Sequence, residues 1–145
     1  MAKLKTPEQK EKERDKRLQK TYGITADDYQ RMLEEQDYGC AICKGDGGER
    51  RLHVDHDHKY RYIKVISVKM AGMWHANAQY RGWSWVSLET TKSKAIQGVR
   101  QKLKVASIRG LTCWPCNRTL RSGNNKPKVF RKMADYLDKF NNGGE

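Results

Sequence analysis

Two Cys-x-x-Cys pairs constrain the fold of this chain more than any other feature. Cys40 and Cys43 form the first pair, Cys113 and Cys116 form the second, and 69 residues lie between them. Each pair can present two thiolates from one tight turn, and four soft sulfur ligands suit a tetrahedral zinc ion. Only 37% of the residues are hydrophobic, so the core should be small and a metal ion would help to hold it. Because four cysteines leave no open position on zinc, the predicted ion is structural.

Two other interpretations of the cysteines stay open. Cys113-Trp-Pro-Cys116 is similar to the active-site turn of thioredoxin-type proteins, although the other pair would then have no role. Four unrelated buried cysteines are the second alternative. The N-terminal stretch MAKLKTPEQK lacks the apolar centre of a signal peptide, and no apolar run approaches membrane-spanning length. We therefore expect a cytoplasmic protein, and in that compartment cysteines favour metal binding over disulfides.

Positive charge is concentrated in the second part of the chain. The formal net charge is +13, with 12 Lys and Arg against 13 Asp and Glu in residues 1–58. Residues 59–108 carry 10 against 1, and residues 109–145 carry 8 against 3. A strongly basic small protein usually binds a polyanion. We expect a polyanion as the partner and no membrane.

Residue patterns predict a mixed α+β chain. Residues 6–20 form either an exposed helix or a solvated arm, and residues 23–36 form a helix with Thr25 as N-cap and Asp28 at its third position. Strands are expected over 51–56, 60–70, 74–88 and 106–113, and a helix over 89–105. A short helix should start near Asn117, and a final amphipathic helix at Pro127. The side chains expected to point inward from that helix are Val129, Phe130, Met133, Tyr136, Leu137 and Phe140.

The stretch HVDHDH, residues 53–58, holds three of the four histidines. Hydrolysis of a phosphodiester needs a base, a hard cation and groups that hold the backbone. Histidine is a natural base near neutral pH, and Asp and amide oxygens suit magnesium or manganese. Asp55 and His56 can both reach one site if the strand ends near Asp55, and Asn117 supplies an amide directly after the second cysteine pair. The alternative is a polar strand end with incidental histidines.

Together, the stretches YGITADDYQRMLEEQDYGCAIC, HVDHDH and IRGLTCWPCNRTL resemble the phage recombination endonuclease VII family of HNH, or His-Me finger, nucleases. The resemblance covers residues 22–58 and 108–140 and implies a zinc-stapled ββα finger with flanking helices. It also implies roles for individual residues. Asp55 and Asn117 would bind the catalytic Mg²⁺ or Mn²⁺, His56 would be the general base, and His58 would contact the scissile phosphate. The cysteines Cys40, Cys43, Cys113 and Cys116 would bind structural zinc.

The chain departs from the family pattern by a basic, aromatic-rich insertion between the two finger strands. We expect a charged arm or helix at 1–21, a nuclease core at 22–58 and 108–140, the insertion at 59–107 and a tail at 141–145. The insertion should form a folded lobe that grips DNA. Alternatively, its aromatic residues form the core of the lobe and its lysines only solvate it. The candidate phosphate contacts are Lys59, Arg61, Lys64, Arg109 and Arg118.

The expected function is that of a metal-dependent DNA endonuclease that uses one metal ion to hydrolyse the phosphodiester bond. By family analogy its substrates would be branched DNA such as four-way junctions, in the cytoplasm of a phage-infected bacterium. One alternative is a site-preferring nicking or homing-type nuclease, and another is a non-catalytic, zinc-stapled DNA-binding protein. Junction resolvers of the family act as dimers, so a homodimer is possible.

Overall fold

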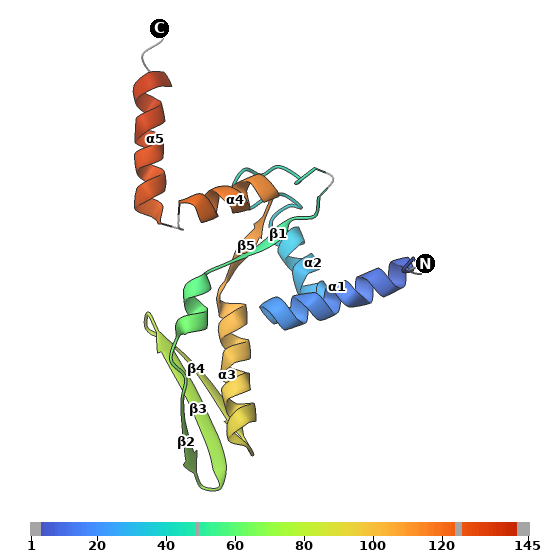
Figure 1. The fold of residues 1–145 in the computed structure, drawn as a ribbon, viewed down its shortest axis with the longest axis vertical. Helices are drawn as coiled ribbons and strands as arrows, with labels where there is room; N and C mark the ends of the chain where they lie inside the picture. Colours follow the sequence, from blue (N-terminus) through green and yellow to red (C-terminus); the bar gives the residue numbers. More distant parts are fainter. Residues whose placement is uncertain (1–3, 49, 124–125, 142–145) are drawn as a thin grey trace. The chain divides into compact units, whose positions relative to one another are not determined.

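The structure is a computed structural model that describes residues 4–48, 50–123 and 126–141. Within these residues it contains five α-helices, a two-stranded sheet and a three-stranded sheet (Figure 1). The predicted α+β class is therefore confirmed. The chain divides into two compact units, one of Met1–Tyr38 with Val54–Leu111 and the other of Gly39–His53 with Thr112–Glu145. None of the described helices is both long and apolar enough to span a bilayer.

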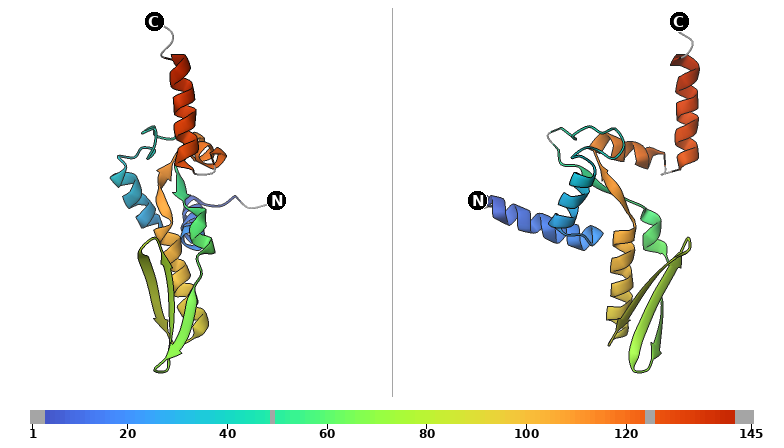
Figure 2. Two further views of the ribbon diagram at one scale, coloured as in Figure 1. Left: turned by 90° about the vertical axis from the view of Figure 1, so that its left-hand side faces the viewer. Right: turned by 180° about the vertical axis from the view of Figure 1, so that it is seen from behind.

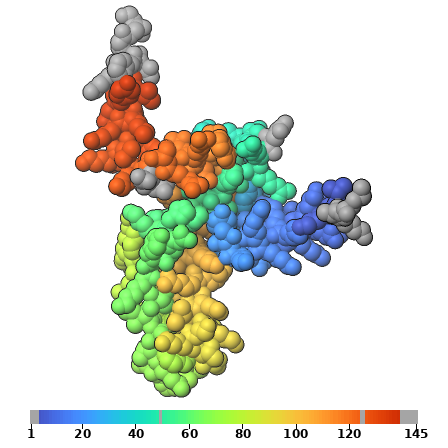
Figure 3. All heavy atoms as spheres, viewed as in Figure 1, coloured from blue at the N-terminus to red at the C-terminus, as the bar shows by residue number. Residues whose placement is uncertain are grey.

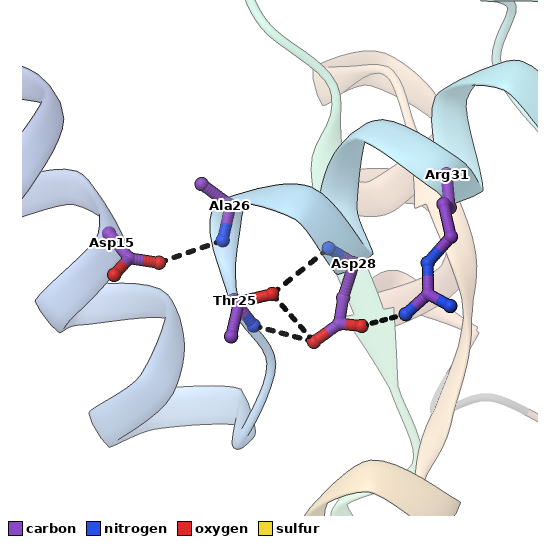
Figure 4. A network of polar contacts seen from close by, with 5 residues as sticks. All are labelled: Asp15, Thr25, Ala26, Asp28 and Arg31. Atoms are coloured by element: carbon purple, nitrogen blue, oxygen red, sulfur yellow. Dashed lines mark hydrogen bonds and ion pairs between the residues drawn. The ribbon is translucent and has the colours of Figure 1, made fainter.

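Two capped helices open the first unit. Helix α1, Pro7–Tyr22, follows a Thr6–Gln9 capping box and ends at Gly23, whose φ of 79° is left-handed. This observation decides between the helix and the solvated arm. Helix α2, Ala26–Glu35, starts at Thr25 as predicted, because the Thr25 hydroxyl accepts from the Asp28 backbone and the Asp28 carboxylate accepts from the Thr25 backbone. Figure 4 shows this capping box with Asp28 bound to Arg31 and with Asp15 of α1 bound to the backbone of Ala26.

Strand β1, His53–His56, pairs with strand β5, Ile108–Thr112, to form the small sheet. Just beyond β1, the Asp57 backbone N–H donates to the Ser107 carbonyl at 2.8 Å. The Gln36 side chain at the end of α2 binds both backbone groups of Leu111, at 2.9 and 2.8 Å. The Gln36 amide therefore bonds to the outer edge of β5 as the backbone of a neighbouring strand would. These two hydrogen bonds link α2 to the sheet.

The insertion contains a short 3-10 helix, η1, His58–Tyr62, followed by strands β2, Ile66–Met70, β3, Met73–Tyr80, and β4, Trp83–Glu89. These strands form an antiparallel sheet in the order β2-β3-β4, and helix α3, Lys92–Ala106, lies along one face of it (Figures 1 and 2). The predicted strand over 60–70 is therefore wrong in its first part. The Asp57 carboxylate accepts from the Lys59 backbone and caps η1, which turns the chain before β2 begins.

A continuous apolar core joins α3 to the sheet. It contains the buried residues Ile63, Ala76, Ala78, Ala95, Val99 and Leu103. The helix lies close to β4, because a Cβ added at Gly98 would be only 2.2 Å from the Ser87 hydroxyl. Trp74, Tyr80 and Trp85 are partly buried and pack against this core, so part of the aromatic content does contribute to the packing of the lobe. Tyr62 and Trp83 do not, since they are 80% and 69% exposed. Figure 3 shows residues of the strands and α3, in green to orange, as one contiguous body.

The second unit carries the two last helices. Helix α4, Trp114–Ser122, begins directly after Cys113 and therefore earlier than the predicted start near Asn117. Helix α5 is Pro127–Asn141 and begins at the predicted residue. The predicted burial of its apolar face is wrong for Met133, Tyr136 and Leu137, which are 48%, 62% and 55% exposed because no described element covers them. Val129 and Phe130 are half-buried, and the side chain of Phe140 lies outside the described residues.

Candidate active site and metal centre

The four cysteines meet in the second unit, as their spacing predicts. The sulfur atoms of Cys40, Cys43, Cys113 and Cys116 all lie within 4.8 Å of one another, and all four are free of disulfide bonds. The sulfurs of Cys43 and Cys113 are 3.7 Å apart. With zinc–sulfur bonds of about 2.3 Å, the edge of a regular tetrahedron is about 3.8 Å. The cluster could therefore hold a structural zinc ion.

The first cysteine turn is closed by its own backbone. The Cys40 N–H donates to the Gly45 carbonyl at 2.8 Å, and the Lys44 N–H donates back to the Cys40 carbonyl at 3.0 Å. Lys44 is left-handed, with a φ of 63°. A Cβ at Gly39 would be 2.6 Å from the Lys44 carbonyl oxygen, so glycine is required for this close return. The turn thereby presents both sulfurs on one side.

The pKa values of the cysteine thiols are consistent with a cation-binding site. Burial raises the pKa of the Cys40 thiol, but the backbone N–H groups of Cys113, Cys43 and Ile42 outweigh it and bring the pKa to about 6. For Cys116, burial and the neighbouring thiols raise the pKa to about 12. Without a cation, the first thiolate therefore opposes ionisation of the others. A zinc ion removes this conflict, because thiols that coordinate zinc are deprotonated.

Asp55 lies on β1 and forms a bidentate ion pair with Arg109 of β5. The Arg109 Nε donates to Oδ2 and its Nη2 donates to Oδ1, both at 2.8 Å. The side chain of Asp55 is 10% exposed and that of Arg109 is 38% exposed. A carboxylate has about four lone-pair positions, so this pairing leaves acceptor positions for a cation. The sequence proposed Arg109 as a phosphate contact; the structure pairs it with Asp55, and the phosphate contact stays a prediction.

His56 is half-buried between two other rings. The Tyr22 ring meets it edge-on at 5.2 Å between centroids, and the His58 ring is tilted against it at 4.4 Å. Burial lowers the pKa of His56 below its usual value, and the nearby His58 lowers it further. β1 continues through His56, so the strand pleat directs Asp55 and His56 to opposite faces. The sequence predicts that both side chains reach one site if the strand ends near Asp55. The strand ends one residue later, at His56.

A pocket of about 310 Å³ opens beside His56 within the first unit. It brings His56 and His58 together, as predicted, and it also contains cations of the insertion that the sequence did not suggest, Arg100 and Lys104. The full lining is Thr21, Tyr22, His56, Asp57, His58, Tyr60, Arg61, Arg100, Leu103, Lys104 and Ser107. Arg100 and Lys104 are one helical turn apart, but that spacing alone does not show which face of α3 meets the histidines.

The other predicted site residues are not among those that line this pocket. Asn117 is half-buried on α4 in the second unit, and its approach to Asp55 stays a prediction. Arg118 is exposed, with its guanidinium 5.1 Å from the centroid of the Trp114 ring. Lys59 lies within η1 and Lys64 follows it, and both side chains are exposed.

Comparison with known proteins identifies the family. The gene 59 protein of Mycobacterium phage L5 is 36% identical over 77 residues, which are 52% of this chain and 44% of that protein. The gene 59 protein of Mycobacterium phage D29 is 36% identical over 93 residues, 63% of this chain and 53% of that protein. The chain thus spans about half the length of these curated relatives, and no solved structure matches it significantly. The profile of the recombination endonuclease VII family matches residues 15–139. Because this match covers most of the chain, the protein belongs to the recombination endonuclease VII family.

Proposed function

We propose that the protein is a metal-dependent DNA endonuclease that hydrolyses a phosphodiester bond by a one-metal His-Me finger mechanism. One observation carries the proposal. In a chain of the endonuclease VII family, His56 of β1 lines a pocket rich in cations, and Asp55 is its neighbour on the same strand. A carboxylate, an imidazole and phosphate-binding cations are the groups that this hydrolysis requires.

His56 is the proposed general base. Its contacts with Tyr22 and His58 hold the imidazole at the pocket wall, where it can take a proton from a water molecule. His58 lines the same pocket and is proposed to contact the scissile phosphate. General-base catalysis of this kind typically contributes about 10²- to 10⁴-fold to a rate.

Asp55 and Asn117 are the proposed ligands of Mg²⁺ or Mn²⁺. Magnesium commonly uses one or two carboxylates and keeps several waters, so one carboxylate and one amide are a sufficient protein contribution. The bound ion would stabilise the negative charge that develops on the phosphate. Arg109 fixes the orientation of the Asp55 carboxylate and limits its electrostatic cost in a buried position.

The proposed finger consists of β1, β5 and α4, which follow one another in this order apart from the insertion. The pairing of β1 with β5 supports it, and so does the start of α4 directly after β5. Structural zinc on the four cysteines would hold the turn before β1 and the start of α4, both in the second unit. Rigid support of this kind is what a small nuclease core needs.

DNA is the proposed partner, with branched DNA as the substrate class suggested by the family. Lys59, Arg61, Lys64 and Arg118 are exposed cations that can bind phosphates. Two alternatives remain to be separated from this proposal, a site-preferring nicking or homing-type nuclease and a non-catalytic DNA-binding protein. A homodimer is also compatible with the exposed apolar face of α5.

The experiment is cleavage of supercoiled, linear, single-stranded and cruciform DNA with Mg²⁺ or Mn²⁺. The His56→Ala variant should lose about 10²-fold or more in cleavage rate while it still binds DNA. His75→Ala is the matched control, because His75 is half-buried on β3 and lies outside the pocket. If the wild-type protein binds DNA but cuts none of these forms, the endonuclease proposal is wrong. Cleavage restricted to one sequence in linear DNA would favour the nicking or homing-type alternative.

A further inference from the structure

The pocket at His56 is built partly by the insertion, and its walls carry a surplus of positive charge. Arg61 comes from η1, and Arg100 and Lys104 come from α3. Asp57 is the only carboxylate among the lining residues. With the histidines neutral, the lining has three positive charges and one negative charge. A concave site with this balance attracts anions.

The positive charges of Arg61, Arg100 and Lys104 are not neutralised by carboxylates of the described residues. Throughout residues 4–48, 50–123 and 126–141, the ion pairs of the structure involve other residues, and Arg61, Arg100 and Lys104 have no carboxylate partner. The Arg100 Nη1 donates to the Ile63 carbonyl at 2.8 Å and to the Arg61 carbonyl at 3.3 Å. The Lys104 ammonium donates to the Lys20 carbonyl at 2.8 Å. Backbone carbonyls therefore orient both side chains without neutralising them.

Donor hydrogens remain on both groups after these contacts. A guanidinium has five N–H donors and an ammonium has three, whereas the contacts of Arg100 involve one nitrogen and Lys104 makes one hydrogen bond. Donors that are held in place before the ligand arrives bind an oxyanion without a large reorganisation cost. The volume of about 310 Å³ is within the range of about 300–1,000 Å³ that is usual for ligand sites.

We propose that Arg100 and Lys104, together with Arg61, form a phosphate-binding subsite beside His56 and hold a backbone phosphate of the DNA strand that is cut. This inference rests on the proposed endonuclease function for the identity of the ligand. The insertion would then not only bind DNA away from the active site, because helix α3 also forms part of the wall of the proposed catalytic pocket. Arg100 and Lys104 are positioning residues for the substrate strand, whereas His56 acts on the water.

The first test is a titration of the zinc-containing protein, without added Mg²⁺ or Mn²⁺, with inorganic phosphate, followed by NMR at the imidazole signals of His56 and His58. The tested variant is the double substitution Arg100→Gln with Lys104→Gln, which removes both charges and keeps an amide donor at each position. Lys102→Gln is the matched control, because Lys102 is also an α3 cation bound to a backbone carbonyl, that of Val86, but lies outside the pocket. We expect saturable shifts in the wild type and the control, and affinity weaker by about tenfold or more in the double variant. Absence of saturable shifts in the wild type, or equal affinity in all three proteins, would overturn the subsite.

The second test measures cleavage by the same proteins and by Arg100→Lys. The double variant should lose cleavage efficiency mainly through a higher KM, and Arg100→Lys, which keeps the positive charge and leaves Lys104 in place, should lose less. Unfolding curves show whether the double variant folds, and if it does not, each single substitution is measured instead. Unchanged KM in a folded double variant would contradict the proposed role. If the wild type cuts no DNA at all, the endonuclease proposal fails, while the phosphate titration still decides whether the subsite exists.

Discussion

The second unit, which contains the four cysteines, and the insertion are stabilised in different ways. In the unit of Gly39–His53 and Thr112–Glu145, two of the most deeply buried side chains are metal-ligand candidates, Cys40 at 0% and Cys113 at 7% exposure. In the insertion, the most deeply buried side chains belong to apolar residues such as Ala76, Val99 and Leu103. A short segment that cannot bury enough apolar surface can be stabilised by a metal ion, whereas a sheet covered by a helix can form a core of its own.

Each part of the proposed function should therefore depend on metal to a different extent. The second unit presents Asn117 and the start of α4, and its local order should require zinc. The insertion presents Arg100 and Lys104, and its order should depend on apolar packing. The two kinds of support can therefore be removed one at a time.

Removal of the sulfur ligands should have the largest effect. We expect about one zinc ion per chain in protein purified without chelator, and Cys40→Ser should release it. Structural zinc contributes about 10–16 kcal/mol of apparent binding energy in zinc-finger peptides, so its loss should unfold the second unit. NMR should show the amide signals of Asn117 collapse while those of Ala76 persist, and elemental analysis gives the zinc content. Ile42→Ala is the control, because Ile42 lies between the two cysteines and is 51% exposed.

Persistence of all signals after zinc removal would break the contrast between the two parts. It would show that the second unit folds on apolar contacts as the insertion does.

The converse change is made in the insertion core. Leu103 is 2% exposed and belongs to the apolar cluster, so Leu103→Ala should lower the free energy of unfolding of the first unit by about 2–5 kcal/mol. The same substitution at Leu88, which is 51% exposed on β4, should cost about 1 kcal/mol or less. Urea unfolding, followed by the fluorescence of the tryptophans, measures both. Zinc content should stay unchanged in each variant, and zinc loss from Leu103→Ala would mean that the two parts unfold together.

Local signals and chemistry made much of this architecture predictable. The Thr25-x-x-Asp28 spacing gives the start of α2, and the demand of zinc for four ligands brings the cysteine pairs together. The ion pair between Asp55 and Arg109 depends on how β1 meets β5 across the insertion, which residue types alone do not determine. The same holds for the face that α3 turns toward His56. Amphipathicity predicted an inward face for α5, but burial also needs a neighbouring element.

The start of α2 is stabilised by polar caps rather than by a metal ion or an apolar core, so a substitution there should cost less than the two above. The Thr25 backbone N–H and hydroxyl, together with Arg31, lower the pKa of Asp28. Asp28→Asn should therefore destabilise the protein at neutral pH, by about 0.5 kcal/mol because the carboxylate is partly exposed.

A carboxyl group whose pKa is lower in the folded state stabilises the protein above its unfolded pKa, and this contribution disappears as pH falls through the folded pKa. The difference between wild type and variant should thus be constant well above the unfolded pKa of about 3.9 and decrease as pH falls through the lower folded pKa. Parallel urea titrations of wild type, Asp28→Asn and the first-turn control Asp27→Asn measure it, and a difference that grows toward low pH would contradict the capping role.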